Sequence, residues 1–275
     1  MKHLILVRGG GELATAAAIY LHHAGFRVLI LEKMQPTSIR REVSFADAAY
    51  DGEKTVERVT CKLADDFKTA EKILKNGGIA MMIDPEGKSI VEFKPQIIVD
   101  GILAKTNTGI KRSMAPHTLA LGAGFCAGRD VDAVIETMRG HDMGRIIYEG
   151  YSKRDEKTED QAAKDALEPV VVAPEMGEIE SLCPISYPVN ENDVIANIKM
   201  ANKEIIAVRS PIKGVIRGIM RSGLIVEKGQ KLAEINHTMR QSQCFLLSDK
   251  ARCIGGSVLE AVMIWEKDNK KRFWE

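Results

Sequence analysis

The chain has few aromatic residues and no excess of charge of either sign. Aromatic side chains make up 5% of its 275 residues, which leaves few surfaces on which the bases of a single-stranded nucleic acid could stack. Its 39 Lys and Arg residues are balanced by 38 Asp and Glu residues, for a formal net charge of +1. A chain with this balance has no overall field that attracts nucleic acid or an anionic membrane. We therefore expect neither as a partner.

Long apolar runs and paired cysteines are also missing. No apolar run reaches the roughly 20 residues that a membrane-spanning helix needs, and no signal peptide precedes the first predicted strand. The cysteines form no CxxC pair, so they indicate neither a disulfide framework nor a zinc site. They are Cys61, Cys126, Cys183, Cys244 and Cys253. We expect a cytoplasmic protein that holds no metal through these residues.

The strongest pattern lies between residues 4 and 32. An apolar run of strand length, 4–7, leads through Arg8 into Gly9, Gly10 and Gly11. Apolar residues then recur at helical spacing, and a second apolar run ends at Glu32. The pattern predicts a strand, a glycine turn, a helix and a second strand.

This turn has the chemistry of a nucleotide-binding site. Glycines let the backbone approach a phosphate closely, and the amides that open a helix carry partial positive charge. The spacing Gly9-x-Gly11-x-x-Ala14 fits the dinucleotide-binding pattern, and Glu32 lies where a carboxylate could accept hydrogen bonds from a ribose. The alternative is a tight turn that binds nothing, because a fold does not determine a function.

Further residues are candidates for the same ligand. Arg40 and Arg41 follow the second strand, at the edge where open α/β sheets bind ligands, and guanidinium groups match phosphate oxygens. A solvated loop is the alternative there. A second glycine turn comes at another predicted strand end. A basic turn follows it and contains His141. This histidine is a candidate phosphate donor or general acid, and the alternative is a structural role. The predicted ligand-binding residues are Arg8, Gly9, Gly10, Gly11, Glu32, Arg40, Arg41, Gly122, Gly124, Arg139 and His141.

The distribution of apolar runs predicts two domains. Short apolar strands separated by helical patterns predict an α/β fold over residues 1–150, with a Rossmann-like, mainly parallel, doubly wound sheet. A charged stretch, 151–168, is predicted to connect it to a β domain at 169–237. The remaining segment, 238–275, contains a helical pattern that either returns to the first domain or caps the β domain.

The β domain contains an internal repeat. Residues 174–179 align with residues 211–216 at a shift of 37 residues, and matching apolar positions follow at the same shift. This predicts a small domain built from two similar halves. It resembles the barrel-sandwich hybrid of lipoyl and biotinyl carrier domains, which implies a modified lysine near Lys203. The sequence motifs around that lysine are absent, however, and an exposed lysine also serves solubility.

Four segments resemble the YqeB-type accessory family of selenium-dependent molybdenum hydroxylase systems. They are VRGGGELAT (7–15), RREVSFADAAYDG (40–52), GFCAGRDVDAVIETMRGHDMGR (124–145) and SDKARCIGGSVLEAV (248–262). The chain is also similar, more distantly, to XdhC-type accessory proteins. The family resemblance implies a helper that matures a molybdenum hydroxylase, with the hydroxylase apoprotein as its partner. Cys126 departs from the family pattern, in which we expect threonine.

The resemblance also favours a ligand for the glycine turn, namely the molybdenum cofactor in its pterin dinucleotide form. Two other functions stay open. An NAD(P)-dependent oxidoreductase would need an acid or base, for which His141 and Lys250 are the candidates. An interaction protein would leave the glycine turn empty. The sequence leaves open whether the chain catalyses a reaction and whether it forms a homo-oligomer.

Overall fold

The computed structural model of the chain describes residues 3–153 and 169–272. Two compact units share the chain, and both are discontinuous. The first consists of Met1–Pro36, Phe45–Thr158 and Leu247–Glu275, and the second of Thr37–Ser44 and Glu159–Leu246. Residues 154–168 of the predicted connection lie outside the described residues.

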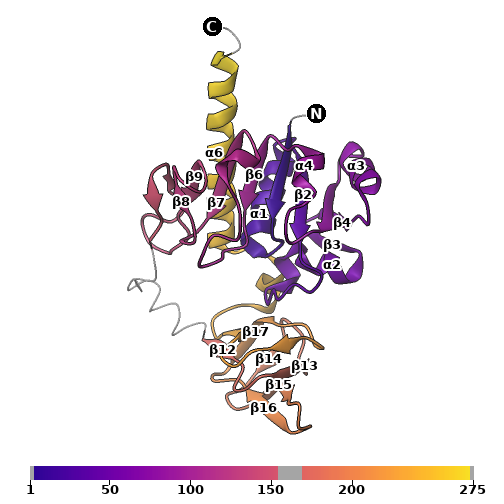
Figure 1. Cartoon of the computed structure of the whole chain (residues 1–275). Helices are drawn as coiled ribbons and strands as arrows, with labels where there is room; N and C mark the ends of the chain where they lie inside the picture. The colour runs from indigo at the N-terminus through magenta and orange to yellow at the C-terminus, as the bar shows by residue number, and fades with distance from the viewer. Residues whose placement is uncertain (1–2, 154–168, 273–275) are drawn as a thin grey trace. The chain divides into compact units, whose positions relative to one another are not determined.

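The first unit is built on a nine-stranded sheet in the order β10-β9-β7-β6-β1-β2-β5-β4-β3 (Figure 1). Its strands are β1 (Leu4–Arg8), β2 (Arg27–Glu32), β3 (Glu53–Val56), β4 (Val59–Leu63), β5 (Ile79–Ile83), β6 (Ile97–Asp100), β7 (His117–Leu121), β9 (Ala133–Ile135) and β10 (Ile146–Ile147). A separate antiparallel pair joins β8 (Cys126–Ala127) and β11 (Gly150–Tyr151).

The arrangement of these strands corrects the predicted fold class. The predicted buried strands at β1, β2, β5, β6 and β7 are present, and they run parallel to one another. The sheet is nevertheless mixed, because β3 pairs with β4 and β10 with β9 in antiparallel fashion. Between β6 and β10, where every residue is described, the chain forms no α-helix. The prediction of a Rossmann-like, doubly wound fold is therefore wrong, although most strand pairs of the sheet are parallel. Apolar runs indicate buried strands, but they do not indicate the crossovers that join them.

Helices cover the sheet and are joined by short turns. They are α1 (Glu12–His23), α2 (Ala48–Asp51), α3 (Phe67–Lys75), α4 (Ile90–Phe93) and α6 (Asp249–Arg272), with the 3-10 turns η2 (Phe45–Asp47) and η3 (Arg112–Met114). The alanine-rich α1 packs against α6, where a Cβ atom on Gly255 would lie 3.1 Å from the carbonyl group of Ala16. The glycine therefore permits the two helices to approach closely.

The sheet is buried on both faces. Leu4 and Leu6 share one hydrophobic cluster with Leu74 of α3 and Phe93 of α4. Successive side chains of a strand point to opposite faces, and Ile5 on the other face is fully buried as well. The first unit thus has a core on each side of its sheet, which fixes the position of the strand ends.

The second unit contains two four-stranded antiparallel sheets, in the orders β12-β19-β17-β14 and β16-β15-β13-β18. The strands are β12 (Val170–Val172), β13 (Gly177–Ser181), β14 (Pro188–Val189), β15 (Val194–Lys199), β16 (Ile205–Arg209), β17 (Gly214–Ile219), β18 (Ile225–Val226) and β19 (Lys231–Asn236). β13, β14 and β15 begin 37 residues before β17, β18 and β19, as in the sequence repeat. The expected barrel-sandwich hybrid is corrected to these two antiparallel sheets, each of which combines strands from both halves and keeps its own edge strands.

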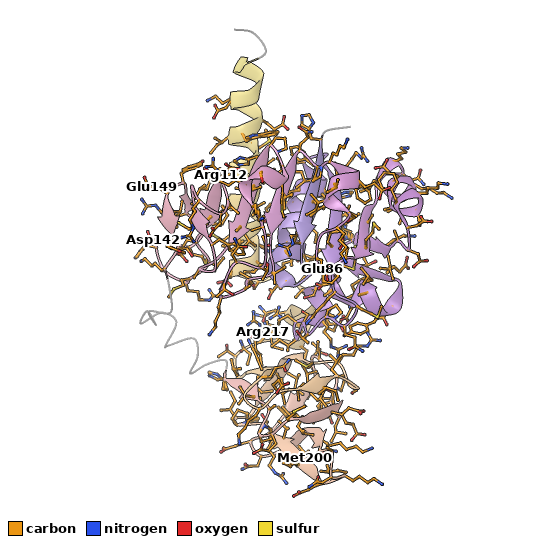
Figure 2. All side chains as sticks on the ribbon, in the orientation of Figure 1. Glu86, Arg112, Asp142, Glu149, Met200 and Arg217 are labelled. Atoms are coloured by element: carbon orange, nitrogen blue, oxygen red, sulfur yellow. The ribbon has the colours of Figure 1, made fainter. Side chains whose placement is uncertain are left out.

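A segment from the N-terminal part of the chain completes the second unit. The amide of Ile219 on β17 donates to the carbonyl of Ile39 over 2.9 Å. A Cβ atom on Gly218 would lie 2.7 Å from that same carbonyl oxygen. Between Ile216 and Gly218 the register of β17 shifts against β19, which marks a bulge. Arg217, which is labelled in Figure 2, lies at this bulge. It pairs with Glu234 over 3.2 Å.

Candidate functional site

The carboxyl ends of three adjacent parallel strands bring the predicted glycine turn together with charged residues. β1 ends at Arg8, β2 at Glu32 and β6 at Asp100. β1 lies between β2 and β6, so the strand order reverses direction at β1. In open α/β sheets, ligands bind outside the carboxyl ends of the strands at such a reversal. This edge is the candidate site.

The glycine turn is held by backbone hydrogen bonds. Gly9 has a φ of +88°, a conformation that favours glycine, and its amide donates to the carbonyl of Leu31 over 2.8 Å. The carbonyl of Gly10 accepts from the amide of Ala46 over 2.9 Å. A Cβ atom on Gly10 would lie 2.9 Å from the nitrogen of Ala46. The close approach at Gly10 therefore serves the chain's own backbone.

Gly11 differs from its two neighbours. It is the N-cap residue of α1, with a φ of −66°, and no side chain caps the helix there. A Cβ atom at Gly11 would have no other atom within 4 Å. The start of α1 therefore has open space on the Cβ side of Gly11.

Glu32 lies against the turn. Its Oε2 atom accepts a hydrogen bond from the amide of Gly10 over 2.7 Å, and its Oε1 atom accepts one from the amide of Lys33 over 2.8 Å. The carboxylate is half-buried. Each carboxylate oxygen has a second lone pair, so Glu32 can hold the turn and still accept a hydrogen bond from a ligand hydroxyl.

Arg8 and Asp100 form a buried ion pair between β1 and β6. Nη1 of Arg8 lies 2.7 Å from Oδ2 of Asp100, and the two side chains are 6% and 0% exposed. Nη2 of Arg8 also donates to the carbonyls of Pro85 and Thr108, each over 3.3 Å. Burial raises the pKa of Asp100, and the nearby Arg8 guanidinium opposes that rise. Arg8 thus joins two loops to the sheet edge, and its charge is already matched by Asp100.

The loop 101–109 contacts both predicted glycine turns. A Cβ atom on Gly9 would lie 3.4 Å from the backbone of Gly101 and Ile102. At the second turn, a Cβ atom on Gly124 would lie 2.2 Å from the carbonyl oxygen of Ala104, and one on Gly122 would lie 3.4 Å from the side chain of Leu103. The glycines of the second turn therefore make room for this loop.

The predicted arginines Arg40 and Arg41 belong to the second unit. Nε of Arg41 donates to the carbonyl of Ile219 over 2.9 Å, and Nη2 of Arg40 donates to the carbonyl of Leu246 over 3.5 Å. The Arg40 residue is only 5% exposed. Both side chains thus bind backbone of the second unit.

Arg139 and His141 lie in the turn between β9 and β10. Arg139 forms a bidentate pair with Asp249, with both nitrogen–oxygen distances at 2.9 Å. Asp249 is the first residue of α6, so Arg139 connects the turn to the start of that helix. His141 is exposed. Asp100 and Asp249 are not among the predicted site residues. The signal for Asp100 is its position directly after the apolar run Ile97–Val99.

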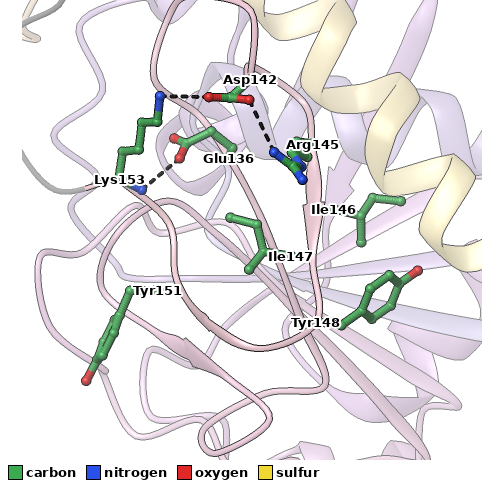
Figure 3. A pocket seen from close by; sticks show the side chains of 8 residues that line it. All are labelled: Glu136, Asp142, Arg145, Ile146, Ile147, Tyr148, Tyr151 and Lys153. Carbon is green, nitrogen blue, oxygen red and sulfur yellow. Dashed lines mark hydrogen bonds and ion pairs between the residues drawn. The ribbon is translucent and has the colours of Figure 1, made fainter.

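A cavity of about 360 Å³ lies on the hairpin that follows β9 (Figure 3). Its lining comprises Glu136, Asp142, Arg145, Ile146, Ile147, Tyr148, Tyr151 and Lys153. Glu136 accepts hydrogen bonds from the amides of Met138 and Lys153. Asp142 pairs with Lys153 over 2.7 Å and with Arg145 over 3.4 Å, and Lys153 and Arg145 hold the pKa of Asp142 below its usual range. The charges around this cavity are therefore matched within the protein.

The described residues contain neither a metal-binding cluster nor a membrane-spanning helix. Within residues 3–153 and 169–272, no cluster of three or more His, Cys, Asp and Glu side chains could hold a metal ion. No helix in this part of the chain has the length and apolar character to cross a membrane.

Comparison with known proteins gave one sequence relative of high similarity. No family model matches the chain. A protein of Escherichia coli (strain K12), described as "Uncharacterized protein YqeB", is 42% identical over 261 residues, which is 95% of this chain and 47% of that protein. The chain thus spans about half the length of this curated relative.

Solved structures show only weak likeness. A succinylglutamate desuccinylase/aspartoacylase family protein of Shewanella amazonensis has a TM-score of 0.28 and 12% identity, over 86% of this chain and 91% of that chain. A succinylglutamate desuccinylase/aspartoacylase of Rhodobacter sphaeroides also has a TM-score of 0.28, with 14% identity over 86% of each chain. Scores of this size show neither a shared fold nor a shared activity.

Proposed function

Because the chain belongs to the YqeB family, we propose that it is an accessory protein of a selenium-dependent molybdenum hydroxylase system. Its first unit binds a nucleotide-type ligand at the turn Gly9–Gly11. The ligand that the resemblance favours is the pterin dinucleotide form of the molybdenum cofactor, and NAD(P) is the alternative. The hydroxylase apoprotein is the partner. The five cysteines are free thiols, which supports a role in the reducing cytoplasm.

The observation that carries the proposal is the open start of α1. A helix N-terminus attracts anions because its first amides lack partners within the helix and carry partial positive charge. Gly11 has no side chain to cap the helix, and apart from the adjoining residues no atom of the described residues lies within 4 Å of its Cβ position. This space at the helix start is where we infer that a phosphate group binds.

Glu32 gives this site a second point of contact. The carboxylate is fixed by the amides of Gly10 and Lys33, so it is oriented before a ligand arrives. A ribose next to the phosphate would offer two hydroxyl donors to a carboxylate in this position. Phosphate recognition by Gly11 and ribose recognition by Glu32 together favour a nucleotide over a simple anion.

The arginines contribute less to this proposal than the sequence indicated. Arg8 is paired with Asp100, and Arg40 and Arg41 bind carbonyl groups of the second unit. Binding at the turn therefore depends on backbone amides, which predicts moderate affinity and a strong dependence on Gly11.

The test compares wild type with Gly11→Asp and Gly11→Asn in calorimetric titrations with NAD and with cytidine diphosphate, two soluble probes that carry a pyrophosphate next to a ribose. Asp and Asn have the same shape and both cap helices well, so both variants should fold. A carboxylate about 4 Å from a phosphate costs between about 1 kcal/mol in water and about 4 kcal/mol near a protein surface. Asp at position 11 should therefore weaken binding at least about fivefold relative to Asn.

Two results would contradict the proposal. Equal binding by the Asp and Asn variants would place the phosphates away from Gly11. Native mass spectrometry that finds the chain bound to the hydroxylase but free of any nucleotide would favour a pure interaction protein. That sample should come from cells in which the selenium and molybdenum pathways are active.

A further inference from the structure

One face of the sheet β16-β15-β13-β18 carries a row of exposed residues. The strand register places Ile225 of β18 opposite Glu178 of β13, Glu178 opposite Lys199 of β15, and Lys199 opposite Ile205 of β16. All four residues are exposed, and Ile225 and Ile205 are 61% and 60% exposed. We call this set the exposed row. It crosses the whole sheet and begins and ends with an isoleucine.

The residues between these positions face the interior. Ile179 and Ile198, the neighbours of Glu178 and Lys199 along their strands, are both fully buried. The exposed row therefore lies on the outer face of the sheet. A second outer row adjoins it, in which Glu180 accepts a hydrogen bond from Asn197 over 3.1 Å.

The internal repeat shows what happens at the equivalent face of the other sheet. At a shift of 37 residues, Glu178 corresponds to Val215 and Lys199 to Asn236, and these two are also register partners. There the chain covers its own sheet. Asn236 is only 6% exposed, and its Oδ1 atom accepts hydrogen bonds from the amides of Thr238 and Met239.

The cover continues beyond this turn. The 3-10 turn η4 (Gln241–Phe245) contacts β17. Sγ of Cys244 in η4 lies 3.7 Å from the carbonyl oxygen of Ile216 on β17. Residues 237–245 thus pack beside the position that the repeat relates to the exposed row, while the exposed row itself has no such cover among the described residues.

We propose that the exposed row binds the same face of a second copy of the chain. The order of the row is apolar, acidic, basic, apolar. A twofold axis along the strand direction, between β13 and β15, places Glu178 opposite Lys199 of the partner subunit and Ile225 opposite Ile205 of the partner subunit. Isologous pairing of this kind requires a self-complementary surface, and the exposed row fulfils that requirement in both charge and apolarity.

The size of the face predicts the strength of this contact. Three strands of five or six residues and the two-residue β18, about 4.8 Å apart, span roughly 300 Å² of flat area. This is well below the about 800 Å² per partner of a standard interface. We therefore expect a weak dimer that dissociates on dilution. The interaction is independent of nucleotide binding, because the residues of the exposed row belong to the second unit.

Charge reversal tests the pairing with the full-length chain. Glu178→Lys places two lysines opposite each other in every dimer, and Lys199→Glu places two glutamates opposite each other. Sedimentation equilibrium should show that each variant is monomeric at concentrations where wild type dimerises. An equimolar mixture of the two variants should dimerise again, because each lysine then faces a glutamate across the axis.

Controls separate this result from simpler explanations. Lys203→Glu and Glu204→Lys change the net charge equally in the exposed turn between β15 and β16, and they should leave dimerisation unchanged. Circular dichroism should show that all variants are folded. A wild-type chain that stays monomeric up to about 1 mM, where binding would be worth less than about 4 kcal/mol, would overturn the proposal. So would a mixture of the two reversed variants that fails to associate. Wild type that binds only the hydroxylase through this face would assign the exposed row to that partner instead.

Discussion

Replacing Arg8 by methionine should destabilise the first unit in a way that depends on pH. Arg8 and Asp100 are 6% and 0% exposed, and their charged atoms lie 2.7 Å apart. Removal of one partner leaves the other charge buried without compensation, which costs about 3–5 kcal/mol. Domains are stable by only about 5–15 kcal/mol, so the loss should be easy to measure. Methionine retains much of the apolar stem of arginine, which limits the loss of packing.

The pH dependence follows from Asp100. Burial already holds its pKa above the usual value in the folded protein, and Arg8 opposes that rise, so Arg8→Met should raise the pKa further. Between the unfolded pKa of about 3.9 and the folded pKa, the folded state binds more protons than the unfolded state. Stability therefore falls as pH rises through that window, by up to about 1.4 kcal/mol per pH unit. The deficit of Arg8→Met should be smallest near pH 4 and largest above neutral pH.

Urea denaturation between pH 4 and pH 8, followed by circular dichroism, measures both effects. The double variant Arg8→Met/Asp100→Asn is the matched control, because it has no carboxylate to titrate. Its free energy of unfolding should exceed that of Arg8→Met at pH 8, and its deficit against wild type should vary less with pH. Two results would contradict this reasoning. One is a loss of less than about 1 kcal/mol in the free energy of unfolding of Arg8→Met, well short of the cost of an uncompensated buried charge. The other is a loss that is the same at all pH values.

Two more predictions concern residues of the first unit. Gly124→Ala should lower the free energy of unfolding by about 1–3 kcal/mol, because its Cβ atom would lie 2.2 Å from the carbonyl oxygen of Ala104. Thermal unfolding measures this loss. Gly11→Ala is the control and should differ from wild type far less, because its Cβ atom meets no atom of the described residues within 4 Å outside the adjoining residues. His117 lies 3.7 Å from Asp132; burial lowers the pKa of His117, and Asp132 opposes that shift. Asp132→Asn should therefore lower this pKa further in an NMR titration, and an unchanged or higher pKa would contradict the assignment.

Much of the candidate site could be predicted from the sequence because its parts are close along the chain. A strand, a tight turn, a helix and a second strand bring Glu32 next to Gly10 whatever the rest of the chain does, and the two groups lie 2.7 Å apart. The acid at the end of the run Ile97–Val99 could have been included for the same reason. Asp100 follows a buried strand directly, as Glu32 does.

Partners that are distant along the chain could not be predicted in this way. Arg139 pairs with Asp249, 110 residues later, and Arg41 binds Ile219, 178 residues later. A basic residue after a strand looks the same whether it faces a ligand or another part of the protein. The fold class failed for a related reason, because runs such as β9 and β10, three and two residues long, carry no information about strand direction.

The placement of Thr37–Ser44 in the second unit has a consequence for the order of folding. This segment leaves the ribosome early, but the strand that it binds, β17, is made much later. Arg41 and its partner Ile219, for example, are 178 residues apart. Domains generally fold as units during synthesis, and contacts so far apart in sequence form slowly. The first unit also waits for its last helix, α6, before α1 is fully packed. The first unit therefore cannot finish folding before the second has been synthesised, and the second unit needs the segment Thr37–Ser44, which lies between two parts of the first. A chain cut between the two units would yield two incomplete parts and no independent domain.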